Sequence, residues 1–261
     1  MKTRLTAIVG ALSLAAALSL TVTGSAFAAG TTDQGPAGTG ACASLKAATT
    51  VTASPSKDGA LLLQAIKSFG NCEINRRFAT LTDLSNRVSA SKVLTSGDAS
   101  ALKTIIDNTT AGLTSLKTQL DGETTIAAAR QDVVNIAVQY RVYLLVVPQV
   151  HLTNASDGVL AAQTKFADIN TALSNAIAAA KAAGKDTTTA QQDLDAMNAS
   201  VTAAVNLAQP LPAALLALTP AQYNAGPGAT TVKNARAALL QARDDLMAAV
   251  NSAEACRNAL K

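Results

Sequence analysis

The stretch VKNARAALLQARDDLMAAVNSAEACRNAL, residues 232–260, carries the pattern that decides the fold. Its apolar and small residues recur at alternating steps of three and four; they are Val232, Ala235, Leu239, Ala242, Leu246, Ala249, Ala253, Cys256 and Leu260. Steps that average about 3.5 residues keep an apolar stripe on one side of an α-helix, which suits helices packed lengthwise in a bundle. The stretch therefore predicts a long amphipathic helix that opens near Thr230 and runs almost to Lys261.

Five further segments show the same spacing, and Gly, Pro or small polar residues separate them, as expected where helices end. They predict helices over residues 58–93, 98–120, 124–147, 156–183 and 188–208, followed by a Pro-containing loop and the C-terminal helix. Within that loop, Thr219-Pro220-Ala221-Gln222 matches a capping box and predicts a short turn of helix. The predicted fold class is all-α, an elongated antiparallel bundle of about six long amphipathic helices.

The alternative arrangement is two three-helix bundles in tandem, and Pro148 decides between the two. Proline lacks the amide donor and disfavours helix at the preceding residue, so we expect it to end the third helix. A hairpin there would form one compact bundle and allow Cys72 to meet Cys256. A straight continuation would separate these two cysteines and favour a bond between Cys42 and Cys72. We prefer one compact bundle over residues 58–261, with subdivision near Pro148 as the alternative, and the pairing of the cysteines stays open.

The N-terminus has the features of a secretory signal peptide. Lys2 and Arg4 form a short basic region, an apolar run follows, and Ala26-Phe27-Ala28 supplies the small residues that signal peptidase recognises. We predict a signal peptide over residues 1–28 and a flexible leader over residues 29–57. No second apolar run reaches the about 20 residues that a membrane span needs. The expected protein is secreted or extracytoplasmic, without stable membrane insertion, in a compartment where a disulfide can form.

Charge and aromatic content argue against nucleic acid as a partner. The full chain has 21 basic and 17 acidic residues, and removal of Lys2 and Arg4 with the signal peptide leaves 19 against 17. With no Trp, four Phe and three Tyr, the chain has neither a broad basic face nor many stacking platforms. Arg76-Arg77 is the one adjacent basic pair after the signal peptide, and we expect it on a solvated helix face.

Residues that usually carry catalysis are scarce. His151 is the only histidine, and its place just after Pro148 predicts a surface turn between the third and fourth helices. No Cys or His spacing suits a metal, and no phosphate-binding glycine loop or nucleophile elbow occurs. The closest carboxylate pairs, Asp193 with Asp195 and Asp244 with Asp245, are neighbours that point in different directions on a helix. We predict no catalytic residues, no cofactor and no metal site.

The segment Tyr140-Arg141-Val142-Tyr143-Leu144 is the most distinctive stretch of the chain. Tyr140 and Tyr143 continue the apolar stripe of their helix, so we expect their rings in the core or at its rim. Arg141 lies off that stripe and is available to a carboxylate of another helix. A speculative ligand or interaction site would combine Tyr140, Arg141, Tyr143 and His151.

Several short motifs together resemble an uncharacterised group of secreted, Ala-rich helical proteins from Gram-positive, high-GC bacteria. The motifs are Tyr140-Arg141-Val142-Tyr143 with Val147-Pro148-Gln149, Ala183-Gly184-Lys185-Asp186, Leu218-Thr219-Pro220-Ala221 and Ala242-Arg243-Asp244-Asp245-Leu246. The resemblance spans most of the mature chain. It implies secretion and a helical fold, and it assigns no activity to any residue.

These observations favour a non-enzymatic helical spacer or protein-interaction module at the cell envelope, with an envelope component or another protein as its partner. The alternative is a carrier of a small apolar ligand held between helices, which predicts that Phe166 or Tyr140 lines a pocket.

Overall fold

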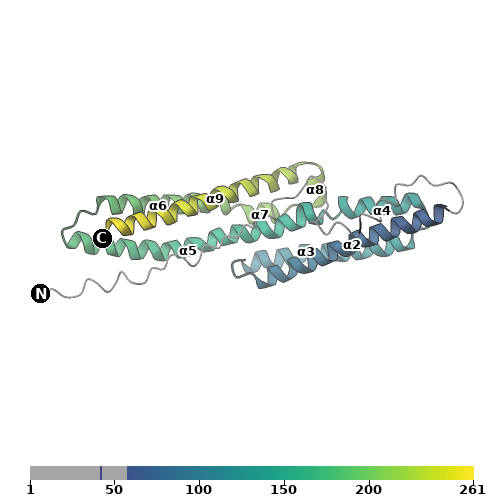
Figure 1. The fold of residues 1–261 in the computed structure, drawn as a ribbon, viewed down its shortest axis with the longest axis horizontal. Coiled ribbons are helices and arrows are strands. Elements are labelled where there is room, and N and C mark those ends of the chain that lie inside the picture. The colour runs from purple at the N-terminus through teal and green to yellow at the C-terminus, as the bar shows by residue number, and fades with distance from the viewer. Residues whose placement is uncertain (1–41, 43–57) are drawn as a thin grey trace.

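The structure, a computed structural model, describes Cys42 and residues 58–261. The predicted signal peptide and, apart from Cys42, the predicted leader lie outside the described residues. The described part is all-α, as predicted, and contains no strand. Its elements are α2 (Asp58–Ala90), α3 (Ser96–Gly122), α4 (Ile126–Val138), the π-helix η4 (Val142–Val146), α5 (Val147–Ala182), α6 (Thr188–Ala208), α7 (Leu211–Leu216), α8 (Pro220–Asn224) and α9 (Pro227–Ala259). Figure 1 shows two groups of helices laid end to end.

The N-terminal bundle consists of α2, α3 and α4. The hydroxyls of Thr95 and Thr125 cap the starts of α3 and α4 by accepting hydrogen bonds from backbone amides three residues ahead. The buried stripe of α3 contains Leu102, Ile106, Leu113, Leu116 and Leu120, and it packs against the apolar residues of α2 and α4. Gly70 of α2 faces Leu120 and Val133 so closely that a methyl group there would collide with both side chains. Glycine therefore allows the three helices of this bundle to approach closely.

The C-terminal bundle consists of α5, α6 and α9. The stripe predicted for α9 is buried from Val232 to Cys256, and it faces the buried residues Leu194, Met197, Val201 and Ala204 of α6. Many of these positions are Ala, whose small side chain permits close helix contact. The two short helices α7 and α8 connect α6 to α9 at the inner end of this bundle (Figure 1).

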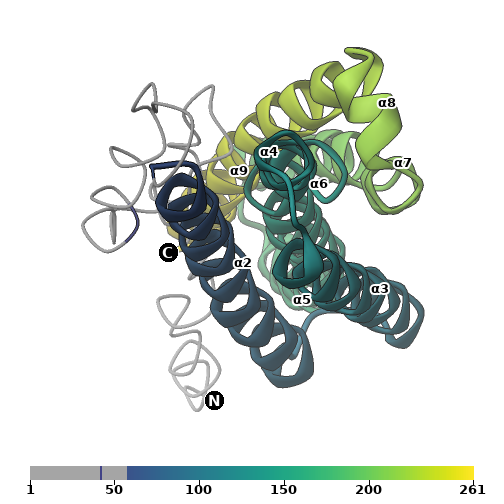
Figure 2. The same ribbon diagram turned by 90° about the vertical axis from the view of Figure 1, so that its right-hand side faces the viewer.

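One helical axis belongs to both bundles. α4, η4 and α5 follow one another over the 57 residues Ile126–Ala182, which span about 85 Å at 1.5 Å per residue. Pro148 lies in the first turn of α5, so the prediction that it ends a helix is wrong. Proline is tolerated in the first turn of a helix because its fixed φ suits the helical backbone. The end-on view in Figure 2 shows α4 and α5 lying between the helices of the two groups.

The compact bundle that we prefer on sequence grounds is therefore not observed, because no hairpin forms at Pro148. The buried apolar residues fall into two clusters, one around α2, α3 and α4 and one around α5, α6 and α9. The arrangement corresponds to the alternative of two bundles in tandem. At the junction, Val146 belongs to the first cluster and Leu145 to the second, so adjacent residues of η4 face different cores.

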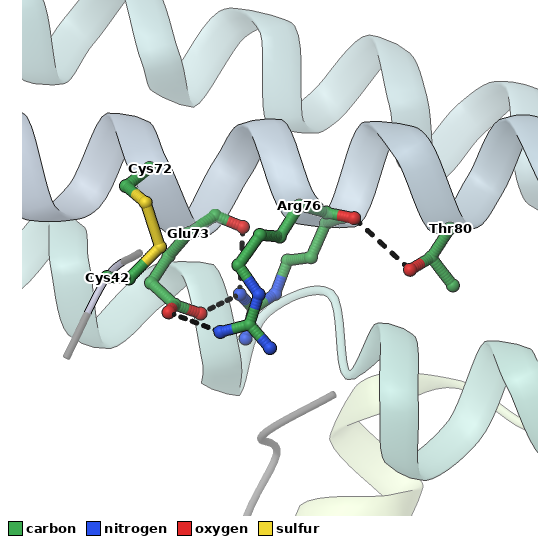
Figure 3. Close-up of polar contacts among 6 residues, drawn as sticks. Cys42, Cys72, Glu73, Arg76 and Thr80 are labelled. Atoms are coloured by element: carbon green, nitrogen blue, oxygen red, sulfur yellow. Dashed lines mark hydrogen bonds and ion pairs between the residues drawn. A yellow bond between two sulfur atoms is a disulfide. The ribbon is translucent and has the colours of Figure 1, made fainter. Parts of the chain in front are cut away.

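The disulfide pairing agrees with the straight course of the chain at Pro148. Cys42 and Cys72 form a disulfide with their Cα atoms 5.9 Å apart, and Figure 3 shows it beside Glu73 of α2. Cys256 is a buried free thiol in α9. The pairing that the sequence left open is thus the one that a straight continuation favours.

Two helical stretches of the described residues are long and apolar enough to cross a membrane by length and composition, Ile126–Ala182 and Thr188–Leu216. Neither stretch was singled out from the sequence, where only an uninterrupted apolar run was expected to span a bilayer. In the most apolar window of each, 50% and 33% of the residues are buried inside the protein. Apolar residues of both stretches, such as Phe166 and Met197, contribute to the C-terminal core.

Candidate functional site at the junction of the two bundles

The axial helix changes its geometry at Arg141. This residue has a left-handed backbone, with φ 45° and ψ 39°. Its carbonyl then accepts hydrogen bonds from the amides of Leu145 at 2.8 Å and Val146 at 3.3 Å, and the second of these has the π-helical spacing. Pro148 has no amide for the carbonyl four residues before it, so a wider turn that passes over the proline is favoured. Because π-turns occur frequently at functional sites, the surroundings of η4 are the first candidate region.

The short helix α8 binds residues at this break. Arg141 donates a hydrogen bond from Nε to Oδ1 of Asn224 at 2.6 Å, and its guanidinium lies 5.7 Å from the ring centre of Tyr223. Asn224 in turn donates from Nδ2 to the carbonyl of Val138 at 2.9 Å, which satisfies an acceptor at the end of α4. The expected partner of Arg141 was a carboxylate, and that prediction is wrong because an amide oxygen of α8 takes its place.

Polar residues in the first turns of α5 bind the ends of neighbouring helices. Gln149 is buried and donates from Nε2 to the carbonyls of Leu215 and Leu218 at 2.8 and 3.1 Å. Ser156 is also buried and donates to the carbonyl of Ala208 at 2.7 Å. The carbonyls of Ala208 and Leu215 lie in the last turns of α6 and α7, and that of Leu218 lies two residues after α7. The contacts fix the connection between α6 and α8 to the axis.

The loop between α2 and α3 is attached to α5 by two hydrogen bonds. Ser91 donates to Oδ1 of Asn154 at 2.6 Å, and the amide of Thr95 donates to Oδ2 of Asp157 at 2.8 Å. Asp157 is only 2% exposed, and burial raises the pKa of its carboxyl above the usual range. The Thr95 amide opposes that rise, whereas nearby Asp98 adds to it. The loop is therefore held by a carboxyl group that burial drives towards its neutral form.

His151 lies beside this loop, within α5 and not in a turn, because the helix continues through Pro148. Burial lowers the pKa of its imidazole, Arg87 of α2 lowers it further, and Asp83 acts in the opposite direction. Arg87 and Asp83 form an ion pair at 2.7 Å. A surface pocket of about 430 Å³ opens next to the imidazole, lined by Arg87, Val88, Ala90, Ser91, Lys92, Val93, Leu94, Val150, His151 and Asn154.

Arg77 joins α2 to the axial helix. Its side chain is 2% exposed, and its guanidinium lies 5.0 Å from the ring centre of Tyr143. Glu73 binds both Arg76 and Arg77, each through a contact of 2.8 Å, and Figure 3 shows Glu73 beside Arg76. The prediction that Arg76-Arg77 forms a solvated face is therefore wrong. The burial of a stacked, paired arginine inside the N-terminal bundle is the physical reason.

The four residues of the speculative site do not surround one pocket. Tyr140 packs its ring on Gly112 of α3, and burial raises the pKa of its hydroxyl. Tyr143 packs beneath the α2 guanidinium, Arg141 reaches α8, and His151 faces the last turns of α2. The four residues thus contact three different helices, α2, α3 and α8, and among them only His151 lines the pocket described above.

Several residues of the junction were not singled out by sequence reasoning. Gln149 and Ser156 occupy positions of the apolar stripe that contains Val159. A polar side chain at a core position needs a hydrogen-bond partner, and this pattern could have identified both residues from the sequence. Asn224 and Asp157 had no such signal, because their partners lie 83 and 62 positions away in the sequence.

The described residues offer little for catalysis by a nucleophile or a metal. Burial raises the pKa of the Cys256 thiol, and Asp193 raises it further, so the thiol stays protonated near neutral pH. Within Cys42 and residues 58–261, no three His, Cys, Asp or Glu side chains gather as they would around a metal ion. The junction instead consists of hydrogen bonds that join helices, and its open feature is the pocket beside His151.

No protein-family model matches the chain, and no curated protein or solved structure is significantly similar to it. The resemblance to secreted, Ala-rich helical proteins therefore stays a prediction.

Proposed function

We propose that the mature protein is a non-enzymatic spacer at the cell envelope, which holds two interaction surfaces at a fixed distance. The observation that carries the proposal is the axial helix Ile126–Ala182, which runs through both bundles. The α3–α4 turn and the α5–α6 turn lie at its opposite ends. A chain that must separate two binding partners gains length most directly from such an axis.

The contacts at the junction support rigidity. Asn224 of α8 binds Arg141 at the break. The side chains of Gln149 and Ser156 bind the connection between α6 and α8. Asp157 binds the loop before α3. A π-turn without such contacts would be a natural hinge. With them, bending at the junction requires several hydrogen bonds to break at once.

An extracytoplasmic location fits the signal features of residues 1–28 and the disulfide between Cys42 and Cys72. Disulfides persist in oxidising compartments and are rare in the cytoplasm.

The carrier of an apolar ligand receives less support. That function predicts Phe166 or Tyr140 at a pocket, whereas Phe166 is 3% exposed within the C-terminal core and Tyr140 packs on Gly112. The described pocket has Arg87, Lys92 and His151 in its lining, which does not suit an apolar occupant.

The test places a photo-crosslinking amino acid at one of three exposed positions of the full chain. Thr124 marks the α3–α4 turn, Ala183 marks the α5–α6 turn, and Lys165 on the side of α5 is the matched control. After incubation with intact cells of the source organism and irradiation, we expect envelope adducts from the two end positions and few from Lys165. No adduct at any position, or the same adducts at all three, contradicts the spacer.

A further inference from the structure

The proposed spacer function assigns no role to the residues that line the pocket beside His151. It lies where the last turns of α2 and the following loop face α5. Three of its side chains are basic or can become so: Arg87 from α2, Lys92 from the loop and His151 from α5. No carboxylate is among the residues that line it.

The polar groups of the pocket are mainly donors. Arg87 uses Nε to bind Asp83, which leaves the two terminal nitrogens of its guanidinium as further donors. Asn154 accepts from Ser91 through Oδ1, so that its amide nitrogen remains a donor. Lys92 is exposed and contributes an ammonium group. Donors and cations that line one pocket, with the one nearby carboxylate, Asp83, outside the lining, are the chemistry that recognises an oxyanion.

The rest of the lining is apolar. Val93 is 36% exposed and Leu94 is half-buried, and Leu94 packs against the N-terminal core to which the buried Val88 and Val150 belong. The volume of about 430 Å³ lies within the range of small-molecule pockets and exceeds what a single phosphate or sulfate fills. The shape therefore suits an oxyanion that carries an organic group.

We propose that this pocket binds a small phosphomonoester, whose phosphate contacts Arg87, Lys92 and His151 and whose organic part lies against Val93 and Leu94. Arginine and lysine are the usual phosphate ligands, and the apolar floor gives the organic part a surface to cover. The binding is reversible and involves no chemical step.

Protonation of His151 is linked to this binding. Burial and Arg87 hold its imidazole neutral near pH 7, with Asp83 as the nearby carboxylate and Lys92 as the second cation at the pocket. A bound oxyanion favours the charged imidazolium and raises its pKa. By linkage, the oxyanion binds more tightly at a pH where the imidazole is protonated.

His151 is the only histidine of the chain, so its imidazole proton signal in an NMR pH titration is unambiguous. Sulfate is the first probe because, unlike a phosphomonoester, it does not change its charge between pH 5 and 8. With the full mature chain, we expect saturating sulfate to raise the pKa of His151 by about 1 relative to chloride at equal ionic strength. By linkage, sulfate should then bind more tightly at pH 5 than at pH 8, by a factor of at most about ten.

Two matched variants locate the site. Lys92→Gln removes one exposed cation of the pocket, and Lys165→Gln removes an exposed cation from the side of α5. We expect Lys92→Gln to weaken sulfate binding about five- to tenfold and Lys165→Gln to leave it unchanged. Circular dichroism checks that both variants are folded.

The organic part is tested with glycerol 3-phosphate against inorganic phosphate and glycerol, all at pH 8. Tighter binding of glycerol 3-phosphate than of inorganic phosphate, with no binding of glycerol, supports the proposal. Equal binding of both phosphates overturns the phosphomonoester. An unchanged pKa of His151 in sulfate, or equal weakening by the two lysine variants, overturns the oxyanion site altogether.

Discussion

Arg141 is the described non-glycine residue with a positive φ, and it lies where the axial helix changes from α to π geometry. Left-handed backbone is unfavourable for a residue with a Cβ atom, so surrounding contacts have to maintain it. The hydrogen bond to Asn224 and the stacking on Tyr223 provide them. The side chain thus stabilises a conformation that its own backbone disfavours.

Substitutions at Arg141 separate the stabilising contacts of its side chain from the cost of its left-handed backbone. Arg141→Ala and Arg141→Gly both lose the contacts to α8, but only Ala keeps the penalty of a left-handed backbone. We expect both variants to be less stable than the wild type, and Gly to be more stable than Ala by about 1 kcal/mol. Urea denaturation measures the difference. A glycine variant no more stable than the alanine variant would contradict the assigned strain.

Asp157 stabilises the folded protein more at low pH than at neutral pH, which is the reverse of the usual effect of an aspartate. Burial raises its pKa in the folded state, so the folded protein binds its proton more tightly than the unfolded chain does. The protonated carboxyl supports folding at low pH, and this contribution falls as the pH rises above the ordinary aspartate pKa of about 3.9. Asp157→Asn keeps an oxygen for the Thr95 amide and removes the titration. We expect the stability of this variant relative to wild type to increase from pH 4 to pH 8 in denaturant titrations.

Asp186 serves as the control with the opposite sign. Its carboxylate accepts from Thr188, which lowers its pKa, so its contribution is present at neutral pH and lost as the pH falls below the ordinary aspartate value. Asp186→Asn should therefore lose stability relative to wild type at pH 7 and recover near pH 3. If the stability of both variants relative to wild type changed with pH in the same direction, the raised pKa assigned to Asp157 would be wrong.

At the scale of elements, short segments decide how the long helices meet. α8 spans only Pro220–Asn224, yet its last residue binds both Arg141 and the carbonyl of Val138. A capping box between Thr219 and Gln222 fixes the start of α8. The long helices supply the apolar cores, and these short elements fix the break in the axis.

Close contact between helices of the N-terminal bundle depends on Gly70. A Cβ atom there would collide with Leu120 and Val133, whereas a Cβ atom at Gly59 of the same helix meets no atom. We expect Gly70→Ala to destabilise the protein by about 1–3 kcal/mol through overpacking. Gly59→Ala should leave stability unchanged or raise it slightly, since Ala is the better helix former. Thermal denaturation followed by circular dichroism compares the pair, and an equal effect of both would contradict the packing at Gly70.

At the scale of the whole molecule, the end-to-end course of α4, η4 and α5 predicts an extended particle. A compact domain of this length has a radius of gyration of about 17 Å, whereas a uniform rod as long as the axis has about 25 Å. We expect small-angle X-ray scattering of the mature protein to give a radius of gyration of at least about 25 Å and a maximum dimension beyond about 85 Å. A value near that of the compact domain would show that the chain folds back at Pro148.

Local features of the chain were predictable from its sequence. The stripe in residues 232–260 and the Thr219–Gln222 capping box depend on residues within about four positions of one another. Such short-range physics determines where helices form and which face is buried. It accounts for the all-α fold and for the buried stripe of α9.

The tertiary structure alone decided how the helices are arranged. An Ala- and Leu-rich stripe can pack against almost any similar stripe, so the sequence could not choose between a hairpin and a straight course at Pro148. That choice rests on contacts between residues far apart in the chain, such as Arg141 with Asn224 and Asp157 with Thr95. The same straight course pairs Cys42 with Cys72, leaves Cys256 buried and forms the pocket beside His151. Periodicity within a helix is local, whereas the choice of a helix's neighbour is made by packing across the whole chain.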